Sequence, residues 1–518
     1  MDRISWSLYA IGLLLVACGD KTKHAKVVGT PQIPEEYTEP YRPQFHFSPR
    51  ERWMNDPNGL VHHKGIYHLF YQYYPDAMVW GPMHWGHAVS KDMVHWEHKP
   101  IALFPDKNGL IFSGSAVVDH KNSSGFGTLE NPPLVAIFTY HDMQGEKAGR
   151  NDFQTQGIAY SLDNGDSWTK HVGNPVITNE GIRDFRDPKV FWNTLAQCWS
   201  MLLVAGDHLQ IWNSPNLTDW EKVSVFGKDQ GAHGGVWECP DMFPLTVEGG
   251  EEQKWVLLIS INPGAPNGGS GTQYFIGDFD GKTFSSDQKE ARWLDWGTDN
   301  YAGVTYNNLP REQRIFIGWM SNWSYARDTP TFPWRSAMTL PRKLSLRKAK
   351  HYQLINYPLE NLDSIIERGS PQGLALGASA KDSVVLENFN QAEVRFSSEA
   401  RDFKLTFKNN LGDALVLTMD SKKGSLTLDR SKSGKVDFQK DFPRPIQHMP
   451  VPELPPGQRE IRLVLDWSSI EVFLNGGQYA MTAQLFPNAP YTLLEFHNMA
   501  SEPMEIQDLQ INRIARIW

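Results

Sequence analysis

The stretch Trp53-Met54-Asn55-Asp56-Pro57-Asn58-Gly59 places a carboxylate beside a proline just ahead of an apolar segment. Four later stretches occupy corresponding places: Phe112-Ser113-Gly114-Ser115, Arg186-Asp187-Pro188, Glu238-Cys239-Pro240 and Asp299-Asn300-Tyr301-Ala302. They recur at intervals of about 50–70 residues, the length that one four-stranded propeller blade requires. Five openings therefore predict a five-bladed β-propeller over residues 43–347.

Alternation of apolar and polar residues, and not helical periodicity, runs through this region. Short runs at 66–71, 135–139, 255–261 and 314–319 alternate and are broken by Gly, Pro, Asn and Asp, which predicts strands. A second repeat places a polar turn before an aromatic residue: Ser90 before Trp96, Ser161 before Trp168, Ser214 before Trp220 and Gly277 before Phe284. Because the innermost strands of a propeller surround one channel, residues more than about 100 positions apart can meet there.

Residues 348–518 are predicted to form a second domain, because regular hairpins replace the blade pattern. Ile461, Leu463 and Leu465 alternate along one predicted strand, and Ile470, Val472 and Leu474 along the next. The following Asn475-Gly476-Gly477 is typical of a tight turn. This pattern predicts an antiparallel β-sandwich, so the whole chain is expected to be all-β.

The first residues carry a targeting signal. Arg3 precedes an apolar run at 4–17 that is too short to span a bilayer, so residues 1–18 are predicted to be a signal peptide. The run ends Leu15-Val16-Ala17-Cys18-Gly19, which resembles the lipobox of bacterial lipoproteins. That resemblance implies export and lipidation of Cys18, with a membrane anchor on the periplasmic face or at the cell surface; an ordinary secretory signal is the alternative. Residues 19–42, polar and rich in proline, are predicted to be a solvated tether.

The composition is that of an ordinary soluble globular protein, with 40% hydrophobic and 21% charged residues. Lys and Arg are scattered and the formal net charge is −9, so no nucleic-acid partner is expected. The 19 Trp, 17 Tyr and 26 Phe suit large β cores, although an indole face also stacks on a sugar ring. Cys198 and Cys239 are predicted to be buried thiols. The histidines lack the carboxylate spacing of a zinc site, so neither a metal nor a cofactor is expected.

Three of the blade openings contain carboxylates that can do chemistry, Asp56, Asp187 and Glu238. Proline restrains the residue before it, so Asp56 and Asp187 are expected to point in defined directions. One Asp-Pro pair is a common turn, but three carboxylate–proline motifs at equivalent blade positions favour a shared site. Glycoside hydrolysis requires two carboxyl groups, ~5–5.5 Å apart in retaining enzymes. An ionised Asp56 is expected to keep Glu238 protonated, and Arg186 to keep Asp187 ionised.

With these motifs in this order, the chain resembles glycoside hydrolase family 32, the invertases, inulinases and levanases. Further matches to family signatures are Gln72-Tyr73-Tyr74-Pro75, the segment from Trp80 to His87, the segment from Trp334 to Arg342, and the segment from Leu465 to Phe473. The resemblance covers about residues 43–518. It implies a five-bladed propeller followed by a β-sandwich, and cleavage of β-fructosides by double displacement.

The resemblance also implies roles for individual residues. Asp56 would attack the anomeric carbon of fructose, Glu238 would act as acid and base, and Asp187 would stabilise the transition state through fructose hydroxyls. The residues implied to line the fructose pocket are Asn55, Gln72, Trp80, Phe112, Ser113 and Arg186. Core packing is the alternative for the two aromatic residues among them, and Trp85 and Trp319 are assigned to blade cores.

The favoured function is hydrolysis of terminal fructose units from inulin or levan, and also of sucrose. An endo-acting levanase, a fructosyltransferase and a lipoprotein that binds fructan without cutting it are the alternatives; an arabinan- or xylan-cleaving enzyme fits less of the chain. Asp56 favours exo-action, because endo-inulinases resemble a variant with Glu there. The chain departs from the family at Trp467, where a basic residue is common. Loops 142–153 and 262–271 are expected to set linkage and chain-length preference.

Overall fold

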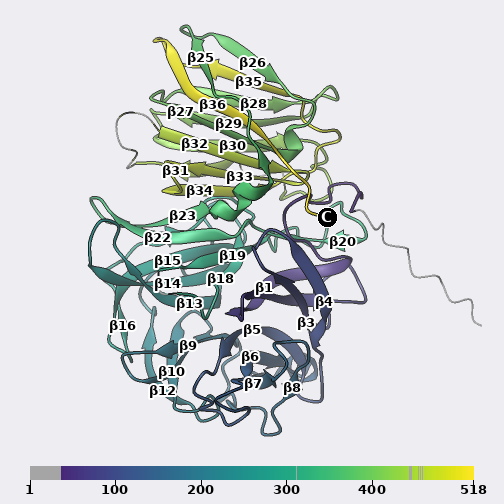
Figure 1. The fold of residues 1–518 in the computed structure, drawn as a ribbon, viewed down its shortest axis with the longest axis vertical. Helices are drawn as coiled ribbons and strands as arrows, with labels where there is room; N and C mark the ends of the chain where they lie inside the picture. Colours follow the sequence, from purple (N-terminus) through teal and green to yellow (C-terminus); the bar gives the residue numbers. More distant parts are fainter. Residues whose placement is uncertain (1–36, 311, 443–445, 453, 455–456, 458) are drawn as a thin grey trace, which may run out of the picture.

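The computed structural model describes residues 37–310, 312–442, 446–452, 454, 457 and 459–518. Two bodies are visible in Figure 1: a ring of sheets at the bottom and a layered pair of sheets above it. Helical structure in the described part is limited to α1 (Met143–Lys147), η1 (Glu360–Ile365) and η2 (Phe389–Gln391). None of the helices in these ranges has the length and apolarity needed to cross a membrane. The predicted signal peptide and its Cys18 lie outside the described residues.

Five sheets, antiparallel except for one short parallel pair, make up the ring, which confirms the predicted five-bladed propeller. The first contains β1 (Arg52–His63), β2 (Ile66–Tyr74), β3 (His84–Ser90) and β4 (Trp96–Leu103). The second contains β5 (Leu110–Val118), β6 (Leu134–His141), β7 (Gln154–Ser161) and β8 (Thr169–Lys170), and the third β9 (Phe185–Asn193), β10 (Cys198–Ala205), β11 (Leu209–Ser214) and β12 (Glu221–Phe226). The fourth contains β13 (Val236–Thr246), β14 (Gln253–Asn262), β15 (Gly271–Phe279), β16 (Phe284–Ser285) and β17 (Arg292–Trp293). The fifth contains β18 (Tyr301–Thr305), β19 (Ile315–Met320), β21 (Ala337–Met338), β22 (Arg342–Lys348) and β23 (Tyr352–Pro358).

The fifth blade both closes the ring and extends past the predicted domain boundary. β20 (Trp334–Arg335) pairs in parallel with the start of β1, so a late segment of the chain joins the first blade to the last. The predicted boundary at residue 347 falls within β22, and β22 pairs with β23 along its whole length. The predicted boundary is therefore too early. The last blade continues to Pro358, the end of its outer strand β23. The alternation of apolar and polar residues does not change there, so no sign of the boundary is visible in the sequence.

The repeated polar turns lie between the third and fourth strands of successive blades. In the first blade, Ser90 Oγ accepts the backbone N–H of Met93, and Asp92 accepts those of Val94 and His95. Ser161 with Asp163, and Ser214 with Asn216, accept backbone N–H groups in the same way in the next two blades. The side-chain acceptors satisfy the N–H groups that the turn leaves unpaired, which explains why a short polar residue recurs there.

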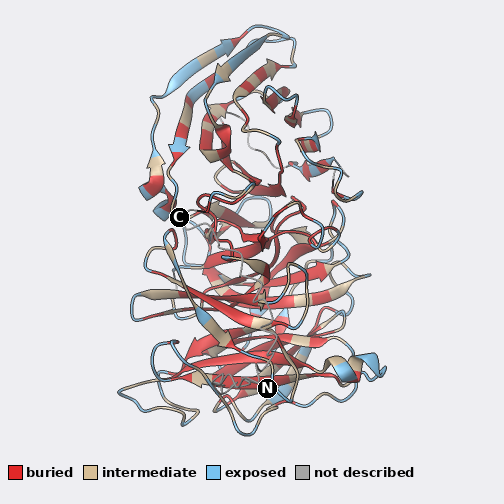
Figure 2. Cartoon of the chain, turned by 90° about the vertical axis from the view of Figure 1, so that its right-hand side faces the viewer, coloured by how far each residue is buried: buried red, intermediate tan, exposed pale blue. Residues whose placement is uncertain are grey.

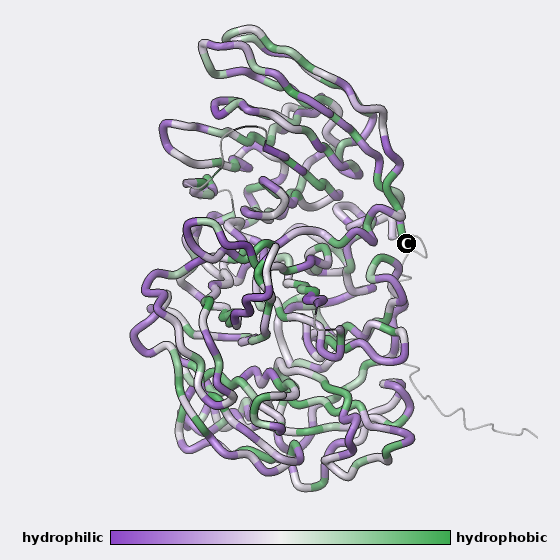
Figure 3. The backbone as a smooth tube through the Cα atoms, turned by 60° about the vertical axis from the view of Figure 1, so that its left-hand side comes forward, coloured by the Kyte–Doolittle hydropathy of each residue, from purple (hydrophilic) through white to green (hydrophobic). Residues whose placement is uncertain are grey.

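Two stacked sheets form the second domain, confirming the β-sandwich. One contains β24 (Ile366–Glu367), β25 (Gln372–Leu376), β27 (Ala392–Ser398), β32 (Arg459–Asp466), β33 (Ser469–Leu474), β34 (Tyr479–Gln484) and β36 (Met504–Ile514). The other contains β26 (Lys381–Val385), β28 (Phe403–Lys408), β29 (Ala414–Asp420), β30 (Ser425–Lys432), β31 (Gln447–Pro450) and β35 (Leu493–Asn498). The alternating residues from Ile461 to Leu474 face the shared core. Figure 2 shows buried residues along the strands of both domains, and Figure 3 shows hydrophilic segments along many of the outer loops.

Residues 37–42 do not form the solvated tether that was predicted for 19–42. Arg42 is fully buried, donates to Glu39 and to the backbone oxygens of Pro49 and Arg50, and lies 4.7 Å from the ring centroid of Trp334. Tyr37 stacks on the indole of Trp518 at the C-terminus, 4.6 Å away. Arginine and tyrosine bury their apolar parts when partners satisfy their polar ends, so this part of the segment packs onto the fold. Residues 19–36 lie outside the described part.

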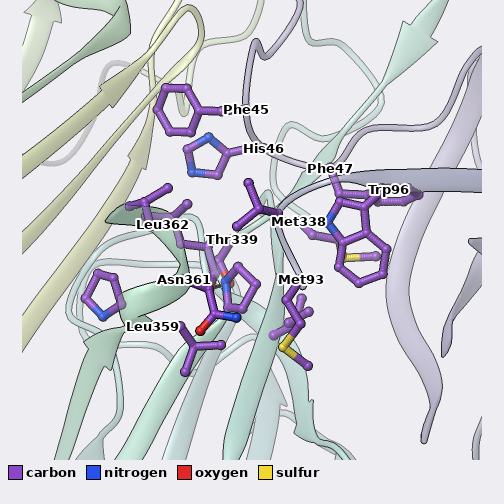
Figure 4. A pocket seen from close by; sticks show the side chains of 15 residues that line it. Phe45, His46, Phe47, Met93, Trp96, Met338, Thr339, Leu359, Asn361 and Leu362 are labelled. Atoms are coloured by element: carbon purple, nitrogen blue, oxygen red, sulfur yellow. Dashed lines mark hydrogen bonds between the residues drawn. The ribbon is translucent and has the colours of Figure 1, made fainter. Parts of the chain in front are cut away.

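Buried charges join the propeller to the sandwich. His46 Nδ1 lies 2.8 Å from Asp466 Oδ2, and its Nε2 lies 2.9 Å from Glu471 Oε1. Arg342, on β22, bonds both Glu471 and Asp295. Figure 4 shows His46 beside Phe45, at the edge of an apolar cavity of about 20 Å³ between the two domains. The family signature around Asp466 therefore lies at the domain junction.

Candidate active site

Every inner strand carries a β-bulge at the position of its opening motif. The pairing slips between Met54 and Pro57 in β1, between Ile111 and Gly114 in β5, between Arg186 and Lys189 in β9, between Glu238 and Asp241 in β13, and between Tyr301 and Val304 in β18. A bulge leaves residues outside the hydrogen-bonded ladder and redirects their side chains, and a proline is tolerated there because it has no N–H to contribute. The bulges explain the recurring carboxylate–proline motifs, and four of the five bulged strands contribute side chains to one pocket.

Asp56 is held by its neighbours from the first two blades. Asn55 donates to its Oδ1 at 3.0 Å, and Ser113 donates to its Oδ2 at 2.7 Å. Asn55 is fixed in turn by a bond from the indole N–H of Trp53 to its Oδ1, at 2.7 Å. The carboxylate is therefore oriented by donors on both oxygens before any substrate arrives.

Asp187 and Cys239 form the floor of the site. Asp187, which has a positive φ of 65°, accepts the backbone N–H of Cys239 at 3.0 Å. The thiol of Cys239 lies 3.6 Å from Asp187 Oδ2 and 3.7 Å from Asp56 Oδ2, so it lies between the two carboxylates. Cys239 is buried as predicted, whereas Cys198 is half-buried.

Glu238 is bonded by two side chains from different blades. Arg186 donates to its Oε1 at 2.9 Å, and the hydroxyl of Tyr301 donates to its Oε2. The second guanidinium N–H group of Arg186 goes to Asp184, at 2.6 Å. Arg186 Nε lies 3.9 Å from Asp187, so this arginine is directed mainly at Glu238 and Asp184.

These groups face a pocket of about 400 Å³. All nine predicted site residues line it: Asn55, Asp56, Gln72, Trp80, Phe112, Ser113, Arg186, Asp187 and Glu238. Trp80 and Phe112 meet edge to face at 6.0 Å, and both are half-buried, whereas Trp85 and Trp319 are fully buried in blade cores as predicted. Gln72 is fixed by a bond to Asn58 at 2.8 Å.

The pocket also contains residues that the sequence did not single out, namely His141, Glu146, Phe153, Gln154, Asp184, Asn262, Trp323 and Arg327. Glu146, Phe153 and Asn262 belong to the two loops expected at the funnel rim. The ring of His141 stacks on Phe112 at 4.2 Å and bonds Glu146 through Nε2 at 3.0 Å. The positions of Glu146, Phe153 and Asn262 depend on how the strands and loops at the rim fold back, which no local motif encodes.

Burial changes the acid–base behaviour of the carboxylates. It raises the pKa of Asp187 to about 7; Arg186 opposes this shift, and the charges of Glu238 and Asp56 support it. Arg186 favours the ionised form of Asp187 as expected, but burial outweighs this effect, because the N–H groups of this arginine point at Asp184 and Glu238. Burial and the charge of Glu238 likewise raise the pKa of Asp56. In the described residues, no group of three or more His, Cys, Asp or Glu side chains is arranged to hold a metal ion.

A propeller channel that brings three carboxylates together beside aromatic and amide side chains defines a glycosidase. Residues 46–358 match the family described as "Glycosyl hydrolases family 32 N-terminal domain", and residues 362–513 match "Glycosyl hydrolases family 32 C terminal". The chain belongs to glycoside hydrolase family 32.

Similar proteins act on fructans, according to their names. A levanase of Bacillus subtilis is 43% identical over 496 residues, covering 93% of this chain and 72% of the levanase. An extracellular exo-inulinase of Aspergillus niger is 42% identical over 521 residues, covering 93% and 96%. The crystal structure of an exo-inulinase from Aspergillus awamori superposes with a TM-score of 0.85 at 38% identity, covering 93% of this chain and 100% of that one.

Proposed function

We propose that this glycosidase releases fructose from the ends of inulin or levan chains, and from sucrose, with retention of configuration. The observation that carries the proposal is the convergence of Asp56, Asp187 and Glu238 in one pocket of a family 32 propeller. The similarity to a levanase and to exo-inulinases supports fructans as the substrate class.

In the first step, a carboxylate oxygen of Asp56 attacks the anomeric carbon of fructose while the bond to the leaving oxygen breaks. Glu238 donates its proton to that oxygen, so the rest of the chain leaves as an alcohol. Asn55 and Ser113 hold Asp56 in place for this attack. In the second step Glu238 takes a proton from water, the water oxygen bonds to the anomeric carbon, and Asp56 is released.

Asp187 is assigned to the fructose hydroxyls. Its carboxylate lies beside that of Asp56, linked through the thiol of Cys239, and it has no part in the covalent steps. Hydrogen bonds to sugar hydroxyls that strengthen at the transition state favour the developing positive charge on the ring. Gln72, Trp80 and Phe112 would then hold the remaining faces of the sugar.

Product analysis tests this proposal. Purified protein incubated with inulin, levan and sucrose should release fructose from the start, whereas a ladder of oligomers would indicate endo-action. Accumulation of new oligosaccharides from sucrose with little free fructose would indicate a fructosyltransferase. Asp56→Ala and Glu238→Ala should each abolish turnover with an unchanged circular dichroism spectrum, and near-parental activity in either would overturn the assignment. Turnover by the parent protein that these two variants lose would also exclude the alternative of a protein that binds fructan without cutting it.

We also propose that the protein is exported and anchored by lipid on Cys18. Two observations support export: the motif around Cys18, and the similarity to an exo-inulinase whose name describes it as extracellular. In a bacterial host, radiolabelled palmitate should be incorporated into the parent protein and not into Cys18→Ala. Membrane association that persists in Cys18→Ala would contradict the anchor.

A further inference from the structure

The end of the channel opposite the active site opens into a second cavity, of about 350 Å³, called the base cavity below. It is lined by the C-terminal parts of four inner strands, β5, β9, β13 and β18, whereas the catalytic carboxylates lie toward the N-terminal parts. Between the two, the channel narrows to a void of about 10 Å³ beside Pro57, Pro188 and Pro240. A ligand in the base cavity is thus separated from the reacting groups.

Two side chains that line the base cavity each carry a buried polar atom without a hydrogen-bond partner. Among the residues that the structure describes, Asp241 Oδ1 and the hydroxyl of Tyr306 have no hydrogen-bond partner, although each side chain is 1% exposed. A buried polar group without a partner is costly, so such atoms mark places where a ligand or water supplies the bond. One atom is an acceptor and the other a donor, which is the complement of a hydroxyl-rich molecule.

Aromatic side chains supply the walls. Phe191, Trp192 and Trp255 line the cavity and are half-buried. The indole of Trp255 is held rigid by Phe191, 6.0 Å away, and by Phe279, 4.9 Å away. A rigid indole beside polar atoms is suited to stacking on a sugar ring, because it presents apolar area with little loss of side-chain freedom.

The charge of Asp241 at the cavity wall is compensated, while His120 and Arg314 also line the cavity. The second oxygen of Asp241 lies 3.2 Å from Lys189 Nζ and accepts the hydroxyl and N–H of Thr305. The carboxylate charge is therefore already compensated inside the protein, and its free oxygen offers a hydrogen-bond acceptor. The base cavity is also of similar size to the pocket of about 400 Å³ at the active site.

We propose that the base cavity is a second, non-catalytic binding site for fructose units of a fructan chain. The inference rests on the proposed function, since a polymer offers repeated units to both ends of the channel. Two sites on one polymer raise the overall affinity by increasing the effective concentration of the second contact, whereas sucrose occupies the active site alone. The base site should therefore affect polymers and leave sucrose unchanged.

The test compares Trp255→Ala and Tyr306→Phe with Trp220→Ala, which removes a half-buried tryptophan of the third blade outside the cavity. Affinity electrophoresis in gels containing inulin or levan should show retention weakened about three- to tenfold in the first two variants and not in Trp220→Ala. The KM for the same polymers should rise by a similar factor, and kcat/KM for sucrose should stay at the parental value. Tyr306→Phe removes one hydroxyl and keeps the ring, so it guards against misfolding of the tryptophan variant.

Unchanged retention in both Trp255→Ala and Tyr306→Phe would overturn the base site. Equal losses on sucrose and polymer would also overturn it, because they would indicate a general structural defect. Competition of retention by inorganic phosphate, and not by fructo-oligosaccharides, would assign the cavity to an anion instead. If the parent protein cleaves none of inulin, levan and sucrose, the proposed function is wrong. The cleavage assays show this separately from the retention measurements, which test the base site.

Discussion

Glu238 is bonded by Arg186 and Tyr301, and the two partners differ in which forms of its carboxyl group they can bond. A guanidinium favours the ionised carboxylate, while a phenol can serve either protonation state by turning its hydroxyl. Burial and the charge of Glu238 raise the pKa of Tyr301 well above its usual range, so its hydroxyl stays protonated. An acid/base residue that cycles between two states needs such an adaptable partner.

Tyr301→Phe tests this role. Loss of a hydrogen bond to an ionisable group costs about 1.5–3 kcal/mol, so kcat on sucrose should fall about ten- to a hundredfold. The ring keeps its packing against Trp319, so the midpoint of thermal unfolding should change little. A parental kcat with an intact fold would show that the bond is not used in the reaction.

Asp187→Asn should stabilise the protein while it inactivates the enzyme. The pKa of this carboxyl is about 7 in the folded protein, against an ordinary value of 3.8. Between pH 3.8 and pH 7 the folded protein therefore keeps a proton that the unfolded chain has released. Its contribution to stability therefore declines as the pH rises from 3.8 to 7. At pH 8 the variant should be more stable by about 2–4 kcal/mol, and near pH 4 the difference should vanish.

Thermal or urea unfolding at pH 4 and pH 8 measures this difference. Asp287→Asn, at an exposed aspartate, serves as the control and should show no such change between the two pH values. A variant that is less stable than the parent at pH 8 would contradict the burial cost assigned to Asp187.

At the residue scale, the sequence predicted the groups whose identity is tied to a motif. Asp56, Asp187 and Glu238 stand out because each adjoins or nearly adjoins a proline at a repeated position. Tyr301 also lies in a repeated opening, but a tyrosine there fits core packing equally well. Its hydroxyl reaches Glu238 only because β13 and β18 are neighbours in the closed ring, a relation that no local pattern carries.

At the scale of elements, the bulges in the five inner strands link the repeat to the chemistry. Gly114 lies at the end of the bulge in β5, next to Ser113, which donates to Asp56. A Cβ at this glycine would lie 2.1 Å from the carbonyl oxygen of Ile137 on β6. The two strands can approach closely there only without a side chain.

Gly114→Ala should therefore push β5 away from β6 and displace Ser113. We expect a loss of stability of about 1–3 kcal/mol, from overpacking against backbone, together with a fall in kcat. Gly373→Ala is the matched control, because its Cβ would meet nothing within 4 Å. Parental activity and stability in Gly114→Ala would mean that the strand spacing tolerates the extra methyl group.

The elements themselves could be predicted because blades repeat with a fixed alternation and turn chemistry. The end of the propeller could not, since β23 has the same alternation as a sandwich strand and only its pairing with β22 assigns it to the fifth blade. The packing of residues 37–42 was missed for a similar reason. In the sequence, Glu39 and Arg42 look like solvated polar residues. In the fold they bond each other, and Tyr37 of the same segment stacks on Trp518 at the other end of the described chain.

At the scale of the whole molecule, the two domains are joined by buried ionic groups and not by apolar contact alone. Arg342 lies between Glu471 of the sandwich and Asp295 of the propeller, all with side chains at most 1% exposed. Buried charges are stable only when each has a partner, so removal of one leaves the others uncompensated. The sandwich thereby fixes β22 and the loop before β18, two segments of the blade that provides Tyr301.

His46 makes this junction sensitive to alkaline pH. Burial lowers its pKa, but the bonds to Asp466 and Glu471 outweigh burial and raise the pKa from 6.5 to about 9. The folded protein then holds a proton that the unfolded chain loses above pH 6.5, so this stabilisation is complete below 6.5 and is lost as the pH rises through about 9. Glu471, whose pKa is lowered to about 2, stays ionised throughout this range.

His46→Gln should remove this dependence. The parent should lose about 3 kcal/mol of stability between pH 6.5 and 9.5 that the variant does not lose, and the variant should be the less stable of the two at pH 6.5. Asp187, with a pKa of about 7, titrates within this range in both proteins alike, so the difference between their unfolding curves isolates His46. His351→Gln, at an exposed histidine, should follow the parent at every pH. Parallel curves for His46→Gln and the parent would mean that His46 is neutral in the junction, and the two carboxylates would then be balanced by Arg342 and backbone N–H groups instead.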